Sequence, residues 1–369
     1  MEFAALQPPR RLLFTPGPTM VEPAVYEVLS KPVVSPLDPY FFEVAGQVRA
    51  MLRPLFGTSN DLTFTIPGTG SSGMETAVVN FVEPNSTLAV FSNGYFADRL
   101  SEMGRRQGAR VVRLEKPWGE VFGYDEAAEF VRREKPQVVA FVHAETSTGA
   151  VQDPLPITRA ARDADALVIA DAVTSLGAMP ICVDQTGIDI AYSCSQKGLS
   201  CPPGLAPFTA SPRAVERLRA RKTTVPAWYL DLRLLSEYWD GRKYHHTASA
   251  SLQYALHEGL RLIHAEGLEN RFTRHLRAHQ ALLRGLEALG LRMHVAEKHR
   301  IPHLNTVLVP AGVDDAKVRA TLREKDAIEI AGGLGQLAGR IFRIGVMGPL
   351  ANEDCVRMFL DKFAAALRA

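Results

Sequence analysis

The feature that most constrains the fold is a series of short apolar runs between residues 60 and 210, separated by helix-like stretches. Several runs, such as VVAFV and ALVIA, are continuously apolar, which is typical of strands buried on both faces. Strands that alternate with helices predict a mostly parallel sheet with helices on both faces. We therefore expect an α/β fold with a seven-stranded sheet formed by residues 62–66, 87–91, 110–114, 137–143, 166–171, 189–193 and 206–209. Asp125 is the expected N-cap of one of the helices between them.

The pattern changes after about residue 250. A long helical stretch with breaks is expected over 251–289. Further strands and helices are expected over 305–309, 315–324, 328–331, 341–346 and 352–367, which predicts a smaller C-terminal α+β domain. The first 23 residues contain five prolines, which favours an extended arm lying on another part of the chain. We therefore divide the chain into an arm (1–22), a large domain (23–250) and a small domain (251–369).

Composition narrows the classes of function. The 369 residues include 42 Lys and Arg and 40 Asp and Glu, a net charge of +2 that argues against nucleic acid as the main partner. No apolar run reaches the ~18 residues of a membrane helix, and the first residues lack the apolar core of a signal peptide. We expect a cytoplasmic protein. The four cysteines form no CxxC pair, so we expect reduced core residues and no metal site.

Residues 68–73 read Gly-Thr-Gly-Ser-Ser-Gly between an expected strand and an expected helix. The pattern matches the GxGxxG loop of dinucleotide-binding domains. However, more than 60 residues precede it, and the next strand ends in Ser-Asn-Gly (92–94), without the acidic residue that binds a ribose hydroxyl. A phosphate cradle is favoured, because N–H groups at a helix start attract anions and Thr69, Ser71 and Ser72 add hydroxyl donors. Small residues that only allow close helix packing are the structural alternative.

Two charged residues follow neighbouring expected strands. Asp171 ends the run ALVIAD, where a carboxylate lies at the crevice in which parallel sheets bind ligands. Lys197 follows the run DIAYS, and a lysine removed from water has a lowered pKa and becomes a nucleophile. Taken singly, a turn-capping Asp and a solvated Lys are the alternatives. Together with the phosphate cradle they match pyridoxal phosphate, which needs phosphate donors, an anion beside its ring nitrogen and an amine for its aldehyde.

Several longer segments carry a family pattern over nearly the whole chain. They are LLFTPGPT, GTGSSGMETAVVN, SNGYFADR, HAETSTG, ADAVTSLG, SCSQKGLSCPPGLAPF, YLDLRLLSEYW, YHHTASASLQYAL, IEIAGGLG and FRIGVMGP. By these segments the chain resembles the class V aminotransferases of pyridoxal-phosphate fold type I. Within them it is most similar to the alanine–glyoxylate (serine–pyruvate) aminotransferases.

The resemblance implies a cofactor site with two catalytic residues. Lys197 would form a Schiff base with the cofactor aldehyde and then move the substrate proton, while Asp171 would pair with the pyridinium nitrogen. Phe96 would stack on the ring, Val173 would pack on its opposite face, and Thr146 would bind the phenolic oxygen.

The resemblance also implies a homodimer with shared active sites. The phosphate would be held by Thr69, Gly70, Ser71 and Gln196 of one subunit, and by Tyr244 and Thr247 of the other. Ordinary core or interface positions are the alternatives for these side chains. His143 and Ser175 lie near the crevice in sequence, and we assign them no role.

The resemblance further implies that Arg343, in FRIG, binds the substrate carboxylate as a bidentate fork, with a surface arginine as the alternative, and the small residues Pro16 and Gly17 fit a tight pocket. We expect ping-pong transamination from alanine or serine to glyoxylate or pyruvate. Residues 33–37, VVSPL, lack the basic or aromatic residue of many relatives, so serine–glyoxylate, aminoethylphosphonate, ureidoglycine and pyridoxamine activities stay open. As a second guanidinium for a dicarboxylate, Arg10, Arg11 and Arg340 stay open. A lyase or desulfurase, or a nicotinamide oxidoreductase, is less favoured.

Overall fold

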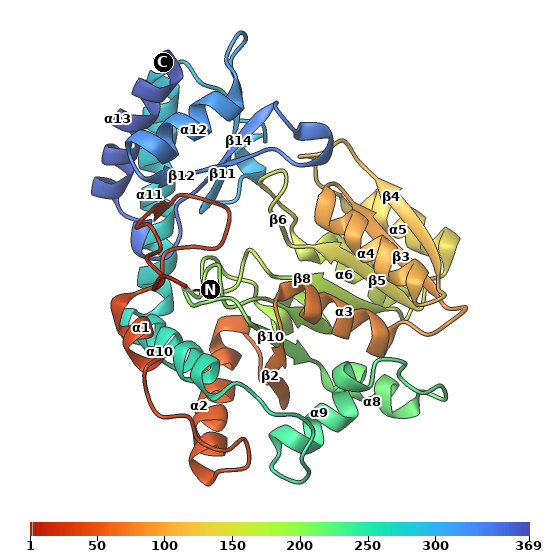
Figure 1. The fold of residues 1–369 in the computed structure, drawn as a ribbon. Coiled ribbons are helices and arrows are strands. Elements are labelled where there is room, and N and C mark those ends of the chain that lie inside the picture. The colour runs from red at the N-terminus through yellow and green to blue at the C-terminus, as the bar shows by residue number, and fades with distance from the viewer. Residues whose placement is uncertain (2) are drawn as a thin grey trace.

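The computed structural model describes Met1 and residues 3–369, and its centre is the expected seven-stranded sheet (Figure 1). The strand order is β2-β10-β9-β8-β5-β3-β4. In this sheet β10 runs opposite to the other six strands, which are parallel to one another, so the mostly parallel sheet is confirmed. The strands are β2 (Leu62–Pro67), β3 (Thr87–Ser92), β4 (Arg110–Glu115), β5 (Val138–Val142), β8 (Leu167–Asp171), β9 (Ile190–Tyr192) and β10 (Leu205–Ala210).

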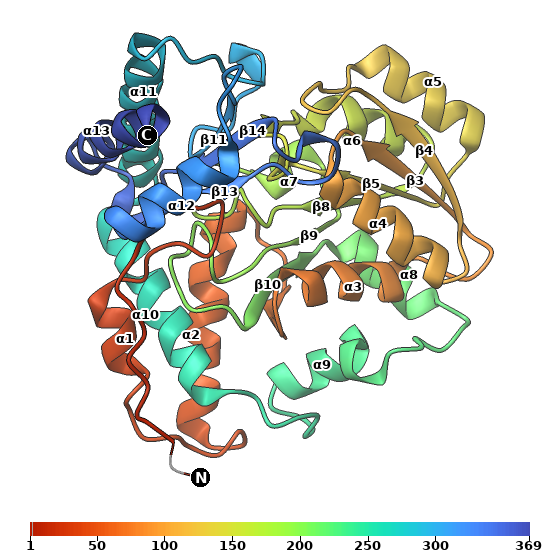
Figure 2. The same cartoon turned by 45° about the horizontal axis from the view of Figure 1, so that its top comes forward.

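Helices cover both faces of this sheet (Figure 2). Along β5, Val138 and Ala140 join the apolar cluster on one face, whereas Val139 and Phe141 join the cluster on the other. This double burial is the reason for the continuous apolar runs in the sequence. One face packs against α3 (Gly70–Phe81), α4 (Tyr95–Arg106), α8 (Pro212–Ala220) and α9 (Leu232–Trp239). The other packs against α2 (Pro39–Phe56), α5 (Tyr124–Glu134), α6 (Pro154–Asp163) and α10 (Ala250–Glu266).

The C-terminal part forms a smaller α+β unit beside the large sheet, drawn in blue in Figure 1. Its antiparallel sheet has the order β11-β14-β13. The expected long helix divides at Gly267 into α10 and α11, and the expected strand 328–331 divides into two short strands. The elements are α11 (Leu268–Ala288), β11 (Leu304–Leu308), α12 (Asp315–Lys325), β12 (Ile328–Glu329), β13 (Ala331–Gly332), β14 (Ile341–Gly345) and α13 (Glu353–Arg368).

The N-terminal arm crosses from the small unit to the large sheet. Its short strand β1 (Leu12–Leu13) pairs in parallel with β12, and Phe14 is buried against Phe359 of α13. Short helix α1 (Pro23–Val28) then packs on α10, whose apolar side chains join the core under the large sheet. The division into 1–22, 23–250 and 251–369 stays a proposal, with α10 belonging to the core of the large part.

One helix start differs from expectation. Asp125 is not the N-cap of α5, because the helix begins two residues earlier than expected, at Tyr124, with Gly123 as its N-cap. The Glu126 carboxylate turns back and accepts the N–H of Gly123 at 2.6 Å. This reciprocal contact satisfies a free N–H at the helix start and displaces Asp125 into the first turn.

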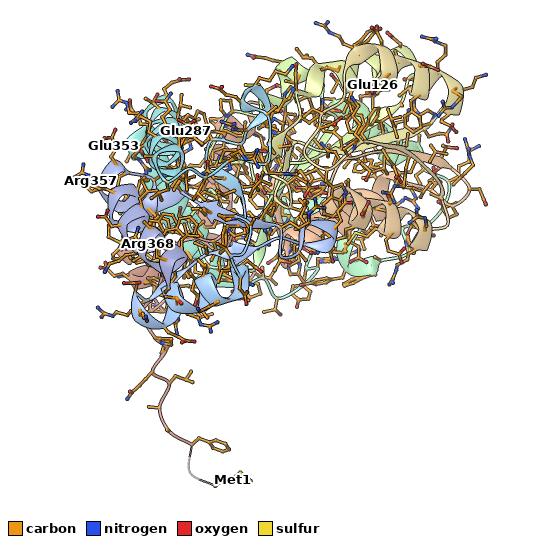
Figure 3. All side chains as sticks on the ribbon, turned by 90° about the horizontal axis from the view of Figure 1, so that it is seen from above. Met1, Glu126, Glu287, Glu353, Arg357 and Arg368 are labelled. Carbon is orange, nitrogen blue, oxygen red and sulfur yellow. The ribbon has the colours of Figure 1, made fainter. Side chains whose placement is uncertain are left out.

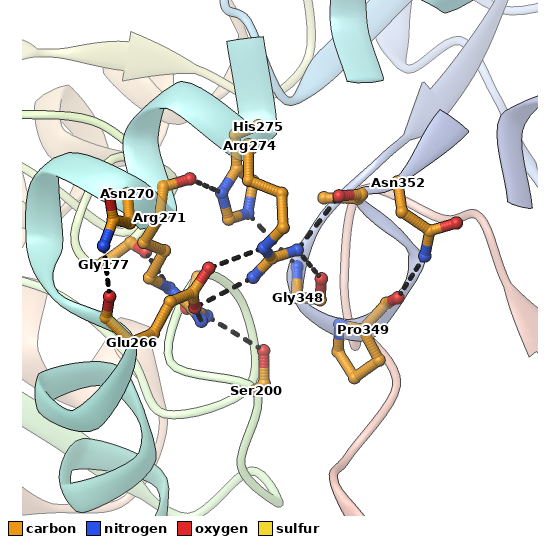
Figure 4. Close-up of polar contacts among 12 residues, drawn as sticks. Gly177, Ser200, Glu266, Asn270, Arg271, Arg274, His275, Gly348, Pro349 and Asn352 are labelled. Atoms are coloured by element: carbon orange, nitrogen blue, oxygen red, sulfur yellow. Dashed lines mark hydrogen bonds and ion pairs between the residues drawn. The ribbon is translucent and has the colours of Figure 1, made fainter. Parts of the chain in front are cut away.

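A polar joint, formed by Glu266, Arg271 and Arg274, connects the two parts where α10 meets α11 (Figure 4). Arg271 is buried and donates to the carbonyl of Gly198, next to Lys197 in the chain, at 2.7 Å. Arg274 donates to the carbonyl of Gly348 in the small unit at 2.8 Å. Glu266 accepts from both guanidinium groups, so one carboxylate holds the two contacts together.

Among the described helices, none has the length and apolarity needed to cross a membrane.

Candidate active site

The carboxyl ends of β2, β3, β5, β8 and β9 meet at one edge of the sheet, because these five strands run parallel. A cavity of about 480 Å³ lies at this edge. It brings together every predicted site residue except Tyr244 and Thr247. The predicted residues that line it are Pro16, Gly17, Thr69, Gly70, Ser71, Phe96, Thr146, Asp171, Val173, Gln196, Lys197 and Arg343.

Lys197 is buried at the centre of this group. Its amine donates to Thr146 Oγ1 at 3.1 Å and to Thr174 Oγ1 at 3.2 Å. Burial lowers the pKa of the amine, because desolvation disfavours the charged form. The geometry therefore gives a lysine with two fixed hydroxyl partners and an enlarged neutral fraction, as nucleophilic and basic lysines require.

Asp171 ends β8 beside β9, and both of its carboxylate oxygens accept hydrogen bonds from uncharged donors. Its Oδ1 accepts the N–H of Val173 at 2.8 Å, and its Oδ2 accepts the Tyr192 hydroxyl at 3.0 Å. Burial raises the pKa of Asp171, while these two hydrogen bonds and the charge of Lys197 oppose the rise. A cationic ring nitrogen placed beside the carboxylate would compensate its desolvation.

The start of α3 forms the expected cradle. The N-cap Thr69 has no side-chain cap, and the N–H groups of Gly70 and Ser71 have no acceptor among the described residues. The side-chain amide of Gln196 has no hydrogen-bond partner among the described residues, so its NH₂ group is free to donate. A Cβ at Gly70 would lie 2.9 Å from Val173 Cγ2, so glycine leaves the space open. Free N–H groups at a helix start, hydroxyls and an uncommitted amide fit a phosphate group.

Arg99 is a cavity residue that the sequence reasoning missed. It lies on α4, three residues after Phe96, and donates to Ser71 Oγ at 3.1 Å. Its guanidinium carbon is 4.8 Å from the centre of the Phe96 ring, and no carboxylate among the described residues pairs with it. The expected alternatives Arg10, Arg11 and Arg340 do not line the cavity. The sequence did contain a signal for Arg99: it follows Phe96 by about one helical turn near the start of a helix, so both side chains lie on the same helix face.

Arg343 lies on β14, the central strand of the small sheet, and reaches into the same cavity. Its Nε donates to the carbonyl of Gly332 at 2.7 Å and its Nη1 to that of Thr146 at 3.3 Å. Burial lowers the pKa of Arg343 to about 10, so the group stays charged at neutral pH. Among the described residues it has no carboxylate partner, which leaves its charge for a ligand.

The remaining sequence expectations lie outside the cavity. Tyr244 is 51% exposed, and its hydroxyl is 2.9 Å from that of Thr247. His143 Nδ1 is 2.7 Å from Ser175 Oγ, and neither residue lines the cavity. Burial lowers the pKa of His143 to about 4, so its ring is neutral at physiological pH. This pair is a core contact beneath the site.

The fold, and a lysine and an aspartate at the ends of adjacent parallel strands, define a pyridoxal-phosphate-dependent enzyme of fold type I. Residues 24–347 match the family described as aminotransferase class-V. The chain therefore belongs to the class V aminotransferases and uses pyridoxal phosphate to exchange amino groups between amino acids and 2-oxo acids.

Three similar proteins illustrate the range of this family. The chain is 38% identical to a (S)-ureidoglycine–glyoxylate transaminase of Bacillus subtilis, over 97% of this chain and 91% of the relative. It is 36% identical to an alanine–glyoxylate aminotransferase of Drosophila melanogaster, over 98% and 93%. The crystal structure of an alanine–glyoxylate aminotransferase from Nostoc sp. superposes with a TM-score of 0.98 at 43% identity, covering 100% of this chain and 98% of that one.

Proposed function

We propose that this aminotransferase moves the amino group of a small L-amino acid, alanine or serine, to glyoxylate or pyruvate. The observation that carries the proposal is Arg343, a buried guanidinium in the same small cavity as Lys197, with no carboxylate partner among the residues that the structure describes. A planar fork binds an α-carboxylate in a bidentate manner. A cavity of about 480 Å³ that also holds the cofactor favours small side chains.

Lys197 acts as the general base in this proposal. Pyridoxal phosphate, when bound, supplies an electron sink for the pair released at the substrate Cα. The Lys197 amine would take the proton from Cα and deliver it to the carbon on the other side of the transferred nitrogen, while the hydroxyls of Thr146 and Thr174 hold Nζ in place. Because burial lowers the pKa of this amine, a larger fraction is neutral and able to accept the proton.

The other cavity residues bind and orient the cofactor. Asp171 faces the ring nitrogen, Phe96 and Val173 pack on the two ring faces, and Thr146 binds the phenolic oxygen. The phosphate would be held by Thr69, Gly70, Ser71 and Gln196, and Arg99, which donates to Ser71 Oγ, would supply a positive charge there.

Ureidoglycine is the second candidate donor, because the (S)-ureidoglycine–glyoxylate transaminase of Bacillus subtilis is 38% identical to this chain. The test is to add L-alanine, L-serine or (S)-ureidoglycine to the purified holoenzyme and to record its visible spectrum. A fitting donor removes the band of the lysine-bound cofactor, and glyoxylate or pyruvate restores it. No response to alanine or serine, with a full response to ureidoglycine, would replace the first candidate by the second.

A desulfurase is disfavoured by its need for a reactive thiol. Burial raises the pKa of Cys194 to about 11 and that of Cys201 to about 12, so neither forms a thiolate at neutral pH.

A homodimer with shared sites is part of the proposal. Tyr244 and Thr247 lie away from the cavity of their own chain, and exposed aromatic side chains, Trp228 and Tyr229, lie near them in sequence. Such surfaces are typical of interfaces. Mixing a Lys197→Ala protein with a Tyr244→Ala protein should restore part of the activity, because hybrid dimers would contain one intact shared site. Strict absence of restoration, with light scattering showing a monomer, would refute the shared site.

A further inference from the structure

We propose that Glu145 is a positioning residue, which fixes the ring of Phe96 in the cavity by capping helix α4 from a neighbouring turn. The inference rests on the proposed function, because it adds a residue to the same cofactor site. Glu145 ends the short strand β6 (Ala144–Glu145), directly before Thr146, and is completely buried.

Helix α4 has no cap of its own. Its N-cap is Gly94, which has no side chain, so the first N–H groups of the helix need acceptors from elsewhere. The N–H of Phe96 donates to Glu145 Oε2 at 3.2 Å, and the N–H of Tyr95 donates to Ser147 Oγ at 3.0 Å. The turn after β6 therefore supplies the cap that the helix lacks.

Glu145 also holds the second acceptor in place. Its Oε1 accepts the backbone N–H of Ser147 at 2.9 Å and the Ser147 hydroxyl at 2.6 Å. With its proton directed to the carboxylate, the Ser147 hydroxyl presents a lone pair to the N–H of Tyr95. Both capping contacts thus depend on one carboxylate.

The close approach explains the glycine at the helix start. A Cβ at Gly94 would lie 2.3 Å from Glu145 Cγ and 2.4 Å from its Cδ. The backbone of Gly94 is extended, a conformation open to any residue, so the glycine is required by space and not by its dihedral angles. The glycine at position 94 therefore leaves room for the Glu145 side chain.

The capping turn reaches the reacting amine as well. Thr146, the next residue, accepts a hydrogen bond from Lys197 Nζ, and Phe96 lines the same cavity. Glu145 has no salt-bridge partner among the described residues, and burial raises its pKa, which its hydrogen bonds to Ser147 and Phe96 oppose. The helix start therefore stabilises the charged form of Glu145, and the charges of Arg343 and Lys197 add to this effect. Weakening the hydrogen bond between Glu145 and Phe96 would therefore displace both the Phe96 ring and Thr146, the hydrogen-bond partner of Lys197.

Glu145→Gln tests the inference. Glutamine keeps one acceptor oxygen but places its NH₂ group toward either Phe96 or Ser147. At that position two N–H donors face each other, and the hydrogen bond is lost. Glu126→Gln is the matched control, because Glu126 accepts an N–H at the start of α5 in the same way. Figure 3 shows Glu126 on α5 at the outer edge of the molecule, and it does not line the cavity.

We expect Glu145→Gln to weaken cofactor affinity by about tenfold, equivalent to about 1.4 kcal/mol, and to reduce the visible circular dichroism per bound cofactor. Glu126→Gln should lower the unfolding temperature and leave both cofactor signals unchanged. Equal losses of thermal stability in both variants, with unchanged cofactor signals, would overturn the positioning role and leave Glu145 as an ordinary cap.

Ser147→Ala keeps the measurement informative if Glu145→Gln does not fold. It removes only the cap of Tyr95, so the same two signals should change in the same direction and by less; unchanged signals would again overturn the inference. These readouts concern cofactor binding alone. A protein that binds the cofactor normally but accepts no amino group from alanine or serine would refute the proposed function and leave this inference intact.

Discussion

Replacing Arg99 with glutamine should weaken the binding of pyridoxal phosphate and leave the binding of pyridoxal, which has no phosphate, unchanged. Arg99 lies beside Ser71 at the start of α3 and has no carboxylate partner among the described residues. A hydrogen bond to a charged group contributes about 1.5–3 kcal/mol, and the partly exposed position of Arg99 favours the lower end. At 1.4 kcal/mol per factor of ten, the expected loss is about tenfold in Kd.

The assay is a titration of cofactor-depleted protein with each ligand, followed by visible absorbance. Arg105→Gln is the control, since Arg105 lies on the same helix but pairs with Glu102 at the surface. Equal weakening for both ligands would refute the reasoning, because the guanidinium would then act on the ring through Phe96 and not on the phosphate. An unchanged affinity for pyridoxal phosphate would refute any role in binding.

Three further predictions follow from the site and the core. Lys197→Ala should abolish the spectral response to every donor, and a remaining response would remove this residue from the reaction. Arg343→Lys should raise KM for both substrates about tenfold, because lysine keeps the charge but loses the fork; a change in kcat alone in steady-state assays would contradict this role. The pKa of His143 is about 4 when folded against about 6.5 when unfolded, so the unfolded chain binds the proton first as pH falls. His143 should therefore contribute about 1.4 kcal/mol per pH unit to the fall in the free energy of unfolding between pH 6.5 and 4. His246 and His303 add terms of the same sign, so His143→Asn should reduce the slope in urea titrations by about that amount, and equal slopes would refute it.

The large sheet and the centre of the site could be predicted because both follow from local patterns. Strands such as β5 are apolar at every position, since both faces are covered. Asp171 and Lys197 follow adjacent strands, and parallel strands bring their carboxyl ends together. Small residues flank both Asp171 and Lys197, which was a further indication that these two charged side chains line a site.

The errors and omissions arise where a structure depends on contacts between distant segments. Asp125 has the right residue type for an N-cap, but Glu126 reaches back to Gly123 and starts α5 earlier. Arg99 looks like an ordinary surface arginine until α4 is placed beside α3. Glu145 looks like an ordinary turn residue, because the uncapped start of α4 is some fifty positions earlier in the chain. The roles of the site residues, the domain limits and the cytoplasmic location stay predictions.

The pairing of β1 with β12 sets the order in which the protein can mature. Ribosomes release the chain from its N-terminus at roughly 5–20 residues per second, so the arm emerges first and its partner strand emerges near the end. The cavity needs Pro16 and Gly17 from the arm and Arg343 from the last strand of the small sheet. The large sheet can thus form while the pocket is still open on two sides. Cofactor capture in its final geometry consequently waits until the chain has been synthesised beyond Arg343, long after the arm has emerged.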